Sequence, residues 1–144
     1  MTDASVFSPR PSTPGLLFLC VANSARSQIA EGLARARFGD RVMVQSAGSR
    51  PETLNPHAAA VLGEIGIDSS GQRSKHVDTI EPASVTTVVT LCEEEVCPVF
   101  LSAAVRLAWP MRDPAGGAGS EAEQRERFRT TRREIARRLD GLVV

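Results

Sequence analysis

The stretch that decides the fold of this chain is Gly15-Leu16-Leu17-Phe18-Leu19-Cys20-Val21-Ala22-Asn23-Ser24-Ala25-Arg26-Ser27. Its apolar run over 15–19 is short and uninterrupted, which is typical of a buried strand. Good helix formers continue from Ser27 to Phe38, with an apolar stripe at Ile29, Leu33 and Ala36 and a closing Gly39. A buried strand that turns through a short loop into a helix predicts the opening unit of an α/β fold.

Beyond this unit the chain alternates between strand and helix patterns. Short apolar or β-branched runs predict three more strands, over residues 42–44, 85–91 and 105–109. Two more helices are predicted, over 58–65 behind the start signal Asn55-Pro56, and over 120–139. This order predicts an α/β fold, a three-layer sandwich around a four-stranded parallel sheet.

The first 14 residues differ in composition from the rest of the chain. Residues 1–14 carry three prolines and no apolar period, so we expect a disordered tail. Residues 15–144 are predicted to form a single domain, with a mostly polar stretch over 66–82 that has room for a short helix around Asp78. The seven arginines of the last predicted helix are expected to lie mostly on a solvated face.

The composition is that of a soluble globular domain, with 42% hydrophobic and 24% charged residues among 144. No apolar run approaches the ~18 residues of a membrane span, and the first residues lack a secretory signal. Seventeen basic residues balance seventeen acidic ones, so no net field attracts nucleic acid or a membrane surface. We therefore expect a cytoplasmic monomer that binds neither nucleic acid nor membrane. Three cysteines in such a chain indicate reactive thiols or a metal site.

Cys20 and Arg26 form the pattern C-x5-R between the first strand and the first helix. The small residues between them can wrap a tight loop, and Asn23 tolerates left-handed backbone angles. Such a loop at a helix N-terminus turns backbone N–H groups inward and binds an oxyanion. The residues predicted to bind it are Val21, Ala22, Asn23, Ser24, Ala25 and Arg26.

The same environment acts on the thiol of Cys20. Inward N–H groups, a helix N-terminus and the Arg26 guanidinium all favour the thiolate, which makes Cys20 the predicted nucleophile. Ser27 is placed to donate its hydroxyl hydrogen to the sulfur. The alternative is a buried structural cysteine beside a serine that starts a helix.

The stretch Leu17-Phe18-Leu19-Cys20-Val21-Ala22-Asn23-Ser24-Ala25-Arg26-Ser27-Gln28-Ile29-Ala30-Glu31-Gly32 closely resembles the low-molecular-weight tyrosine phosphatase superfamily. Within it, the chain is similar to the thioredoxin-coupled arsenate reductases. Three further segments agree: Ser46-Ala47-Gly48, Val88-Val89-Thr90-Leu91-Cys92 and Asp113-Pro114-Ala115-Gly116. The resemblance covers about residues 15–140 and implies a low-molecular-weight tyrosine phosphatase-like fold with no cofactor.

The resemblance implies a thiol cascade on arsenate, with phosphate or sulfate as analogues of the substrate. Cys20 attacks arsenate, and Asp113 is the general acid that protonates the leaving oxygen. Cys92 then attacks the Cys20 sulfur and arsenite leaves. Finally Cys97 attacks Cys92, which frees Cys20 and leaves a Cys92–Cys97 disulfide for thioredoxin or a glutaredoxin-like reductant.

Two features separate this reading from that of a phosphatase. The phosphatase branch follows its Asp-Pro with aromatic hydroxyl residues that hold a phosphotyrosine ring, whereas Ala115 and glycines follow here and the chain has no tyrosine. Phosphoryl transfer also needs only one thiol, while reduction of As(V) needs two electrons from a thiol pair. A phosphatase acting on a small phosphoester remains the second candidate, and residual phosphatase activity is expected.

The segment over residues 92–101 is predicted to rearrange between redox states. Residues five apart on a helix lie too far apart for a disulfide, so Cys92 and Cys97 can bond only where the chain between them is not helical. Pro98 disfavours helical angles at Cys97, and the like charges of Glu93-Glu94-Glu95 disfavour packing. The acidic run should also keep the resting thiols protonated.

The chain departs from the family in two ways. The best-known members separate the second and third cysteines by six residues, and this chain by four. Some relatives also hold potassium with side chains that correspond to Asn23, Glu31 and Ser46 and a later aspartate, whose place Lys75 takes here. We expect no metal site, with the Lys75 ammonium paired to Glu31 and activity insensitive to potassium; a solvated lysine is the alternative.

A third candidate is a protein that binds arsenite or a metal through its three thiols without turnover. Zinc would need a fourth ligand. Neither His57 nor His76 has a useful spacing to a cysteine, and His57 is expected on the surface.

Overall fold

The computed structural model describes residues 13–93 and 96–144. Its core is a parallel sheet in the order β2-β1-β3-β4, built from β1 (Gly15–Leu19), β2 (Met43–Ala47), β3 (Thr87–Thr90) and β4 (Val105–Ala108). The prediction of a four-stranded parallel sheet is confirmed. The prediction of disorder for the tail lies outside the described residues, except at its last two positions.

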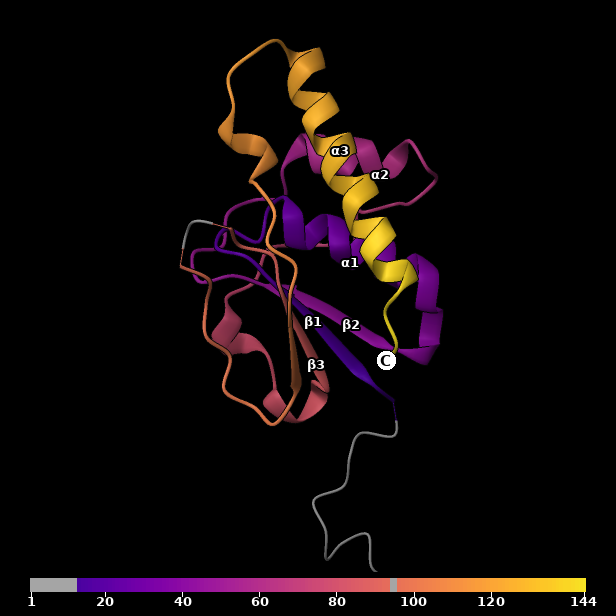
Figure 1. The fold of residues 1–144 in the computed structure, drawn as a ribbon, viewed down its shortest axis with the longest axis vertical. Helices are drawn as coiled ribbons and strands as arrows, with labels where there is room; N and C mark the ends of the chain where they lie inside the picture. Colours follow the sequence, from indigo (N-terminus) through magenta and orange to yellow (C-terminus); the bar gives the residue numbers. More distant parts are fainter. Residues whose placement is uncertain (1–12, 94–95) are drawn as a thin grey trace, which may run out of the picture.

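The three α-helices lie together on one side of the sheet (Figure 1). They are α1 (Arg26–Phe38), α2 (Pro56–Gly63) and α3 (Glu121–Asp140). The start signal at Asn55 acts as predicted, because its side chain accepts from His57 N. At the start of α3, Ser120 forms a capping box with Glu123. The buried stripe of α1 contains Ile29 and Leu33, but Ala36 is exposed, contrary to prediction, because the stripe continues through Ala34 and Phe38, which lie four residues apart.

The two faces of β1 pack into separate apolar clusters, as the two-residue period of a strand requires. Leu16 and Phe18 face the α-helices. Leu17 and Leu19 face the other side, where Phe100 and two 3₁₀ turns, η2 (Val77–Thr79) and η3 (Pro82–Ser84), cover the sheet. The third layer of the sandwich is therefore made of short turns and the segment that follows Cys92.

Two expectations about α3 and α2 are wrong. His57 is not a surface residue: its side chain is only 14% exposed, its ring packs on Phe128, and its Nδ1 accepts from Arg125 Nε at 2.8 Å. Several α3 arginines are also not simply solvated, because Arg129 and Arg132 bind Glu64 of α2. Hydrogen bonds from Arg129 lower the pKa of Glu64 to about 2.

The parallel strands bring their carboxyl ends to one edge of the sheet, so the segments after β1, β2, β3 and β4 meet there. In a parallel α/β sheet this edge is where ligands bind. Among the described residues, no helix is long and apolar enough to cross a membrane.

Candidate active site

The loop between β1 and α1 turns its carbonyl groups away from its own centre. Three of these carbonyls accept backbone N–H groups of the segment after β2, at 2.8–2.9 Å. These pairs are Arg50 N to Val21 O, Glu52 N to Ala22 O and Asn55 N to Ser24 O. The Ala25 carbonyl accepts from Ile29 N within α1.

With the carbonyls bound outward, the loop N–H groups are available to a ligand. Within the described residues, none of the N–H groups of residues 21–25 donates to another group of the protein. Asn23 has φ 48°, and it is the one non-glycine residue described with positive φ. Successive free N–H groups at the start of a helix form a nest for an anion. The predicted oxyanion loop, residues 21–26, thus has the required backbone geometry.

Arg26 is the buried cation of the site, with its side chain 4% exposed. Its Nη1 donates to Met111 O at 2.9 Å and to Leu91 O at 3.3 Å, and so ties α1 to the ends of two other strands. Its Nη2 lies 4.0 Å from Asp113 Oδ2. The structure therefore brings the predicted general acid beside the predicted oxyanion loop, although Asp113 lies 93 positions after Cys20 in the chain.

A chain of buried hydrogen bonds leads from Glu31 to the thiol of Cys20. Ser46 Oγ donates to Glu31 Oε1, Asn23 Nδ2 donates to both Ser46 Oγ and Ser27 Oγ, and Ser27 Oγ lies 2.9 Å from Cys20 Sγ. The amide orientation of Asn23 is set because its Oδ1 accepts from a backbone N–H. Since Nδ2 can only donate, Ser27 accepts from it and has its own hydrogen available for the sulfur. The Ser27 hydroxyl is therefore placed to donate a hydrogen bond to the Cys20 sulfur.

Sequence reasoning missed the residues that hold Asn23 in its left-handed conformation. Its carbonyl accepts from Gln28 Nε2 at 3.0 Å and from Ser74 Oγ at 2.7 Å. Ser74 is 51 positions away, in a polar stretch with no motif, so only the folded chain reveals it. Gln28 is fully buried in the first turn of α1, a position where a long polar side chain could have indicated a hydrogen-bonding role.

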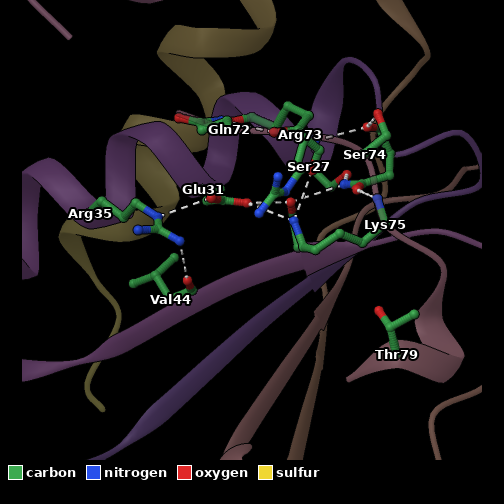
Figure 2. Close-up of polar contacts among 12 residues, drawn as sticks. Ser27, Glu31, Arg35, Val44, Gln72, Arg73, Ser74, Lys75 and Thr79 are labelled. Carbon is green, nitrogen blue, oxygen red and sulfur yellow. Dashed lines mark hydrogen bonds and ion pairs between the residues drawn. The ribbon is translucent and has the colours of Figure 1, made fainter. Parts of the chain in front are cut away.

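Glu31 lies between two cations, as Figure 2 shows. Arg35 Nε is 3.0 Å from Oε2, and Lys75 Nζ is 3.8 Å from Oε1, while the Glu31 side chain is only 2% exposed. Burial lowers the pKa of Lys75, and the charge of Glu31 opposes this shift. The residues here do not fit a bound potassium ion, because two cationic side chains already contact the carboxylate.

Cys92 and Cys97 are joined by a disulfide with a Cα–Cα distance of 5.5 Å. The described residues around them are not helical, which confirms that the bond requires a non-helical segment; Glu94 and Glu95 lie outside the described residues. Cys20 is a free, buried cysteine. Cys20 directly follows Leu19, the last residue of β1. Leu19 pairs with Thr90 at the end of β3, and Cys92 lies two residues past Thr90. Cys97 Sγ is 3.8 Å from Leu19 O.

Among the described residues, no three His, Cys, Asp or Glu side chains gather in a group that could hold a metal ion. A groove of about 630 Å³ runs along β2 and is lined by Glu31, Arg35 and Lys75, but Cys20 does not line it. The site with both a nucleophile and an anion nest is therefore the β1–α1 loop.

Comparison with known proteins gives consistent results. Residues 15–144 match the family model described as low molecular weight phosphotyrosine protein phosphatase. A relative from Halalkalibacterium halodurans, named arsenate reductase, is 40% identical over 126 residues, which cover 86% of this chain and 91% of the relative. A glutaredoxin arsenate reductase from Synechocystis is 31% identical over 130 residues, covering 89% and 95%.

Solved structures agree with this result. An arsenate reductase in its phosphate-binding state superposes with a TM-score of 0.74 at 30% sequence identity, over 89% of this chain and 95% of that one. The family match over residues 15–144 includes both the anion loop and the cysteine pair.

Proposed function

The chain belongs to the low molecular weight phosphotyrosine protein phosphatase family, and from this premise we propose that it is an arsenate reductase. The observation that carries the proposal is the position of a disulfide-forming cysteine pair beside an anion loop that holds a third cysteine. A phosphatase needs the loop and one thiol, and its reaction does not require a disulfide-forming cysteine pair. Two further thiols can supply the two electrons that reduction of As(V) requires.

In the first step, arsenate binds in the loop over residues 21–26, held by N–H groups and by the Arg26 guanidinium. The Cys20 thiolate attacks arsenic, and an oxygen leaves as water after taking a proton from Asp113. The hydrogen of Ser27 stabilises the thiolate before the attack. The product is a Cys20–arsenate adduct in which arsenic is still As(V).

In the second step, the Cys92 thiolate attacks the Cys20 sulfur and forms a Cys20–Cys92 disulfide. The electron pair of the broken sulfur–arsenic bond stays on arsenic, which becomes As(III) and leaves as arsenite. The Cys97 thiolate then attacks Cys92 and releases the Cys20 thiolate. The two electrons have come from two thiols, now joined as the Cys92–Cys97 disulfide. The segment over 92–101 must change shape between these steps.

The disulfide then needs an external reductant, and its surroundings favour a protein dithiol such as thioredoxin or a glutaredoxin-like protein. Three large apolar side chains beside it are strongly exposed: Val96 at 88%, Val99 at 74% and Leu101 at 82%. Exposed apolar side chains clustered on one short segment mark a protein contact surface. Because the cycle requires reduced thiols between turnovers, we assign the protein to the cytoplasm. All groups used come from one chain, so a monomer suffices.

Lys75 completes the proposed site by taking the place of a bound cation. Its ammonium and Arg35 neutralise the buried Glu31 carboxylate, to which Ser46 and Asn23 are hydrogen-bonded. A permanently attached cation keeps this chain of hydrogen bonds in one orientation without a metal ion.

Substitution of each cysteine tests the proposal. Fully reduced Cys97→Ser should release one arsenite per chain and then stop, because no Cys92–Cys97 disulfide can form. Cys92→Ser and Cys20→Ser should release none. Steady-state arsenite formation is measured with thioredoxin, thioredoxin reductase and NADPH, and the single turnover with reduced enzyme alone. If Cys92→Ser and Cys97→Ser retain full steady-state turnover, the reductase proposal is wrong.

A further inference from the structure

The loop that carries Asp113 is held at two points by two different arginines. On one side of Asp113, Met111 O accepts from Arg26 Nη1 at 2.9 Å. On the other side, Pro114 O accepts from Arg127 Nε at 3.3 Å. Arg127 belongs to α3, and α3 packs against η4, the 3₁₀ turn Pro114–Gly116 that follows Asp113.

The Arg127 guanidinium also packs directly against the backbone of Gly117. A Cβ placed at this position would lie 2.6 Å from Arg127 Cζ and 2.8 Å from both Nε and Nη2, so a side chain there would push the guanidinium aside. Nη2 is buried, and it makes no hydrogen bond to any described residue. Burying an unpaired donor costs free energy. Arg127 itself is half-buried, and an arginine that served solubility alone would not place a guanidinium nitrogen out of reach of water.

The carboxyl of Asp113 lies between these two attachments. Its Oδ1 accepts from Ala115 N at 2.9 Å, so the side chain folds back onto η4. This leaves Oδ2 as the oxygen that faces Arg26. Because Pro114 is the next residue in the chain, the hydrogen bond from Arg127 to its carbonyl limits how far the Asp113 carboxyl can move.

We propose that Arg127 is a positioning residue that holds the general acid Asp113 toward the oxyanion loop. The inference rests on the proposed role of Asp113 in the first step of arsenate reduction. Arg127 does not touch the substrate. It acts by keeping one carboxyl oxygen within reach of the oxygen that leaves arsenic, and misplacing a catalytic group by about 1 Å can cost up to about a hundredfold in rate.

The test is a double-mutant cycle read by the single-turnover rate of arsenite release from fully reduced enzyme at saturating arsenate. Arg127→Met keeps a long apolar stem and removes the donors, and it should lower this rate about ten- to a hundredfold with little change in the half-saturating arsenate concentration. Arg127→Lys can still donate to Pro114 O and should restore part of the rate. Arg133→Met is the matched control on the same helix, since Arg133 is exposed and binds only Glu126 among described residues; it should leave the rate unchanged.

The decisive comparison is made in the Asp113→Asn background. If Arg127 acts through Asp113, adding Arg127→Met to Asp113→Asn should cause no further loss. An equal loss in both backgrounds, or a wild-type rate for Arg127→Met, overturns the inference while leaving the proposed reaction intact. A wild-type rate for Asp113→Asn alone overturns the acid role and the inference with it. Melting curves of every variant identify a loss of rate that is due to unfolding.

Discussion

Gly48 lies beneath the oxyanion loop, where the structure leaves no space for a side chain. A Cβ at this position would be 2.3 Å from Val21 O and 2.7 Å from Cys20 O. Both of these are backbone atoms of the loop, so no flexible side chain can move aside. Gly48 is also held on its other side, because its N–H donates to Lys75 O and its carbonyl accepts from Val77 N, each at 2.9 Å.

The substitution Gly48→Ala should therefore displace the loop. Ordinary contacts of a Cβ begin at 3.4 Å, so the Val21 carbonyl has to move by about 1 Å. Overpacking of this kind costs about 1–3 kcal/mol of stability. A shift of about 1 Å in groups that hold the reacting atoms costs up to about a hundredfold in rate. We expect kcat/KM for arsenate to fall by about that factor, with a melting temperature lowered by several degrees.

The assay is steady-state arsenite formation coupled to thioredoxin and NADPH, with thermal unfolding measured in parallel. Gly63→Ala is the matched control, because a Cβ at the end of α2 meets nothing within 4 Å. This control should keep full activity and become slightly more stable, by about 0.5–1 kcal/mol at most. If Gly48→Ala keeps kcat/KM within twofold of the wild type, the loop tolerates displacement and the steric argument is refuted.

Three further expectations concern other parts of the molecule. Replacing sodium by potassium at constant ionic strength should not change kcat, whereas Lys75→Asp should make activity depend on potassium; a marked potassium activation of the wild type would contradict the assignment. Val99→Ser and Leu101→Ser should raise the KM for a protein reductant about tenfold while the rate with dithiothreitol stays unchanged, and equal losses with both reductants would argue against a docking surface. Glu64→Gln should lower the melting temperature at pH 7. Because Arg129 depresses the pKa of Glu64, this stabilisation is fully present above pH 4.5, and the difference between the two proteins should disappear as the pH falls toward about 2.

Much of the chemistry of the candidate site could be predicted because it is local in the sequence. The strand, loop and helix over residues 15–38 follow from one apolar run, a set of small residues and a set of helix formers. Cys20 at the end of the strand and Ser27 next to its sulfur follow from that short stretch, which also allowed left-handed backbone angles at Asn23. The family resemblance implied the pairing of Cys92 with Cys97, and their spacing predicted that the segment between them is not helical when they are joined.

Predictions failed where the answer depended on what packs against a residue from elsewhere. His57 has the sequence context of an exposed first turn, and it is covered by Phe128 and Arg125 from α3. The arginines of α3 read as a solvated face, because nothing in an arginine-rich helix tells which guanidinium finds Glu64 or the carbonyl of Pro114.

The sequence alone predicted a tight loop with a cysteine at its start between the first strand and the first helix, showed two further cysteines, and predicted that the sheet is parallel. These properties depend on backbone conformation and on the period of apolar residues, which neighbouring residues specify. The family resemblance implied a role for Asp113 and the pairing of Lys75 with Glu31, and the tertiary structure places Asp113 beside Arg26 and Lys75 beside Glu31. Only the tertiary structure showed that Gly48 lies beneath the loop. Parallel strands bring their carboxyl ends to one edge whatever their separation in the chain, so the contacts at that edge follow from the order of the strands rather than from any one segment.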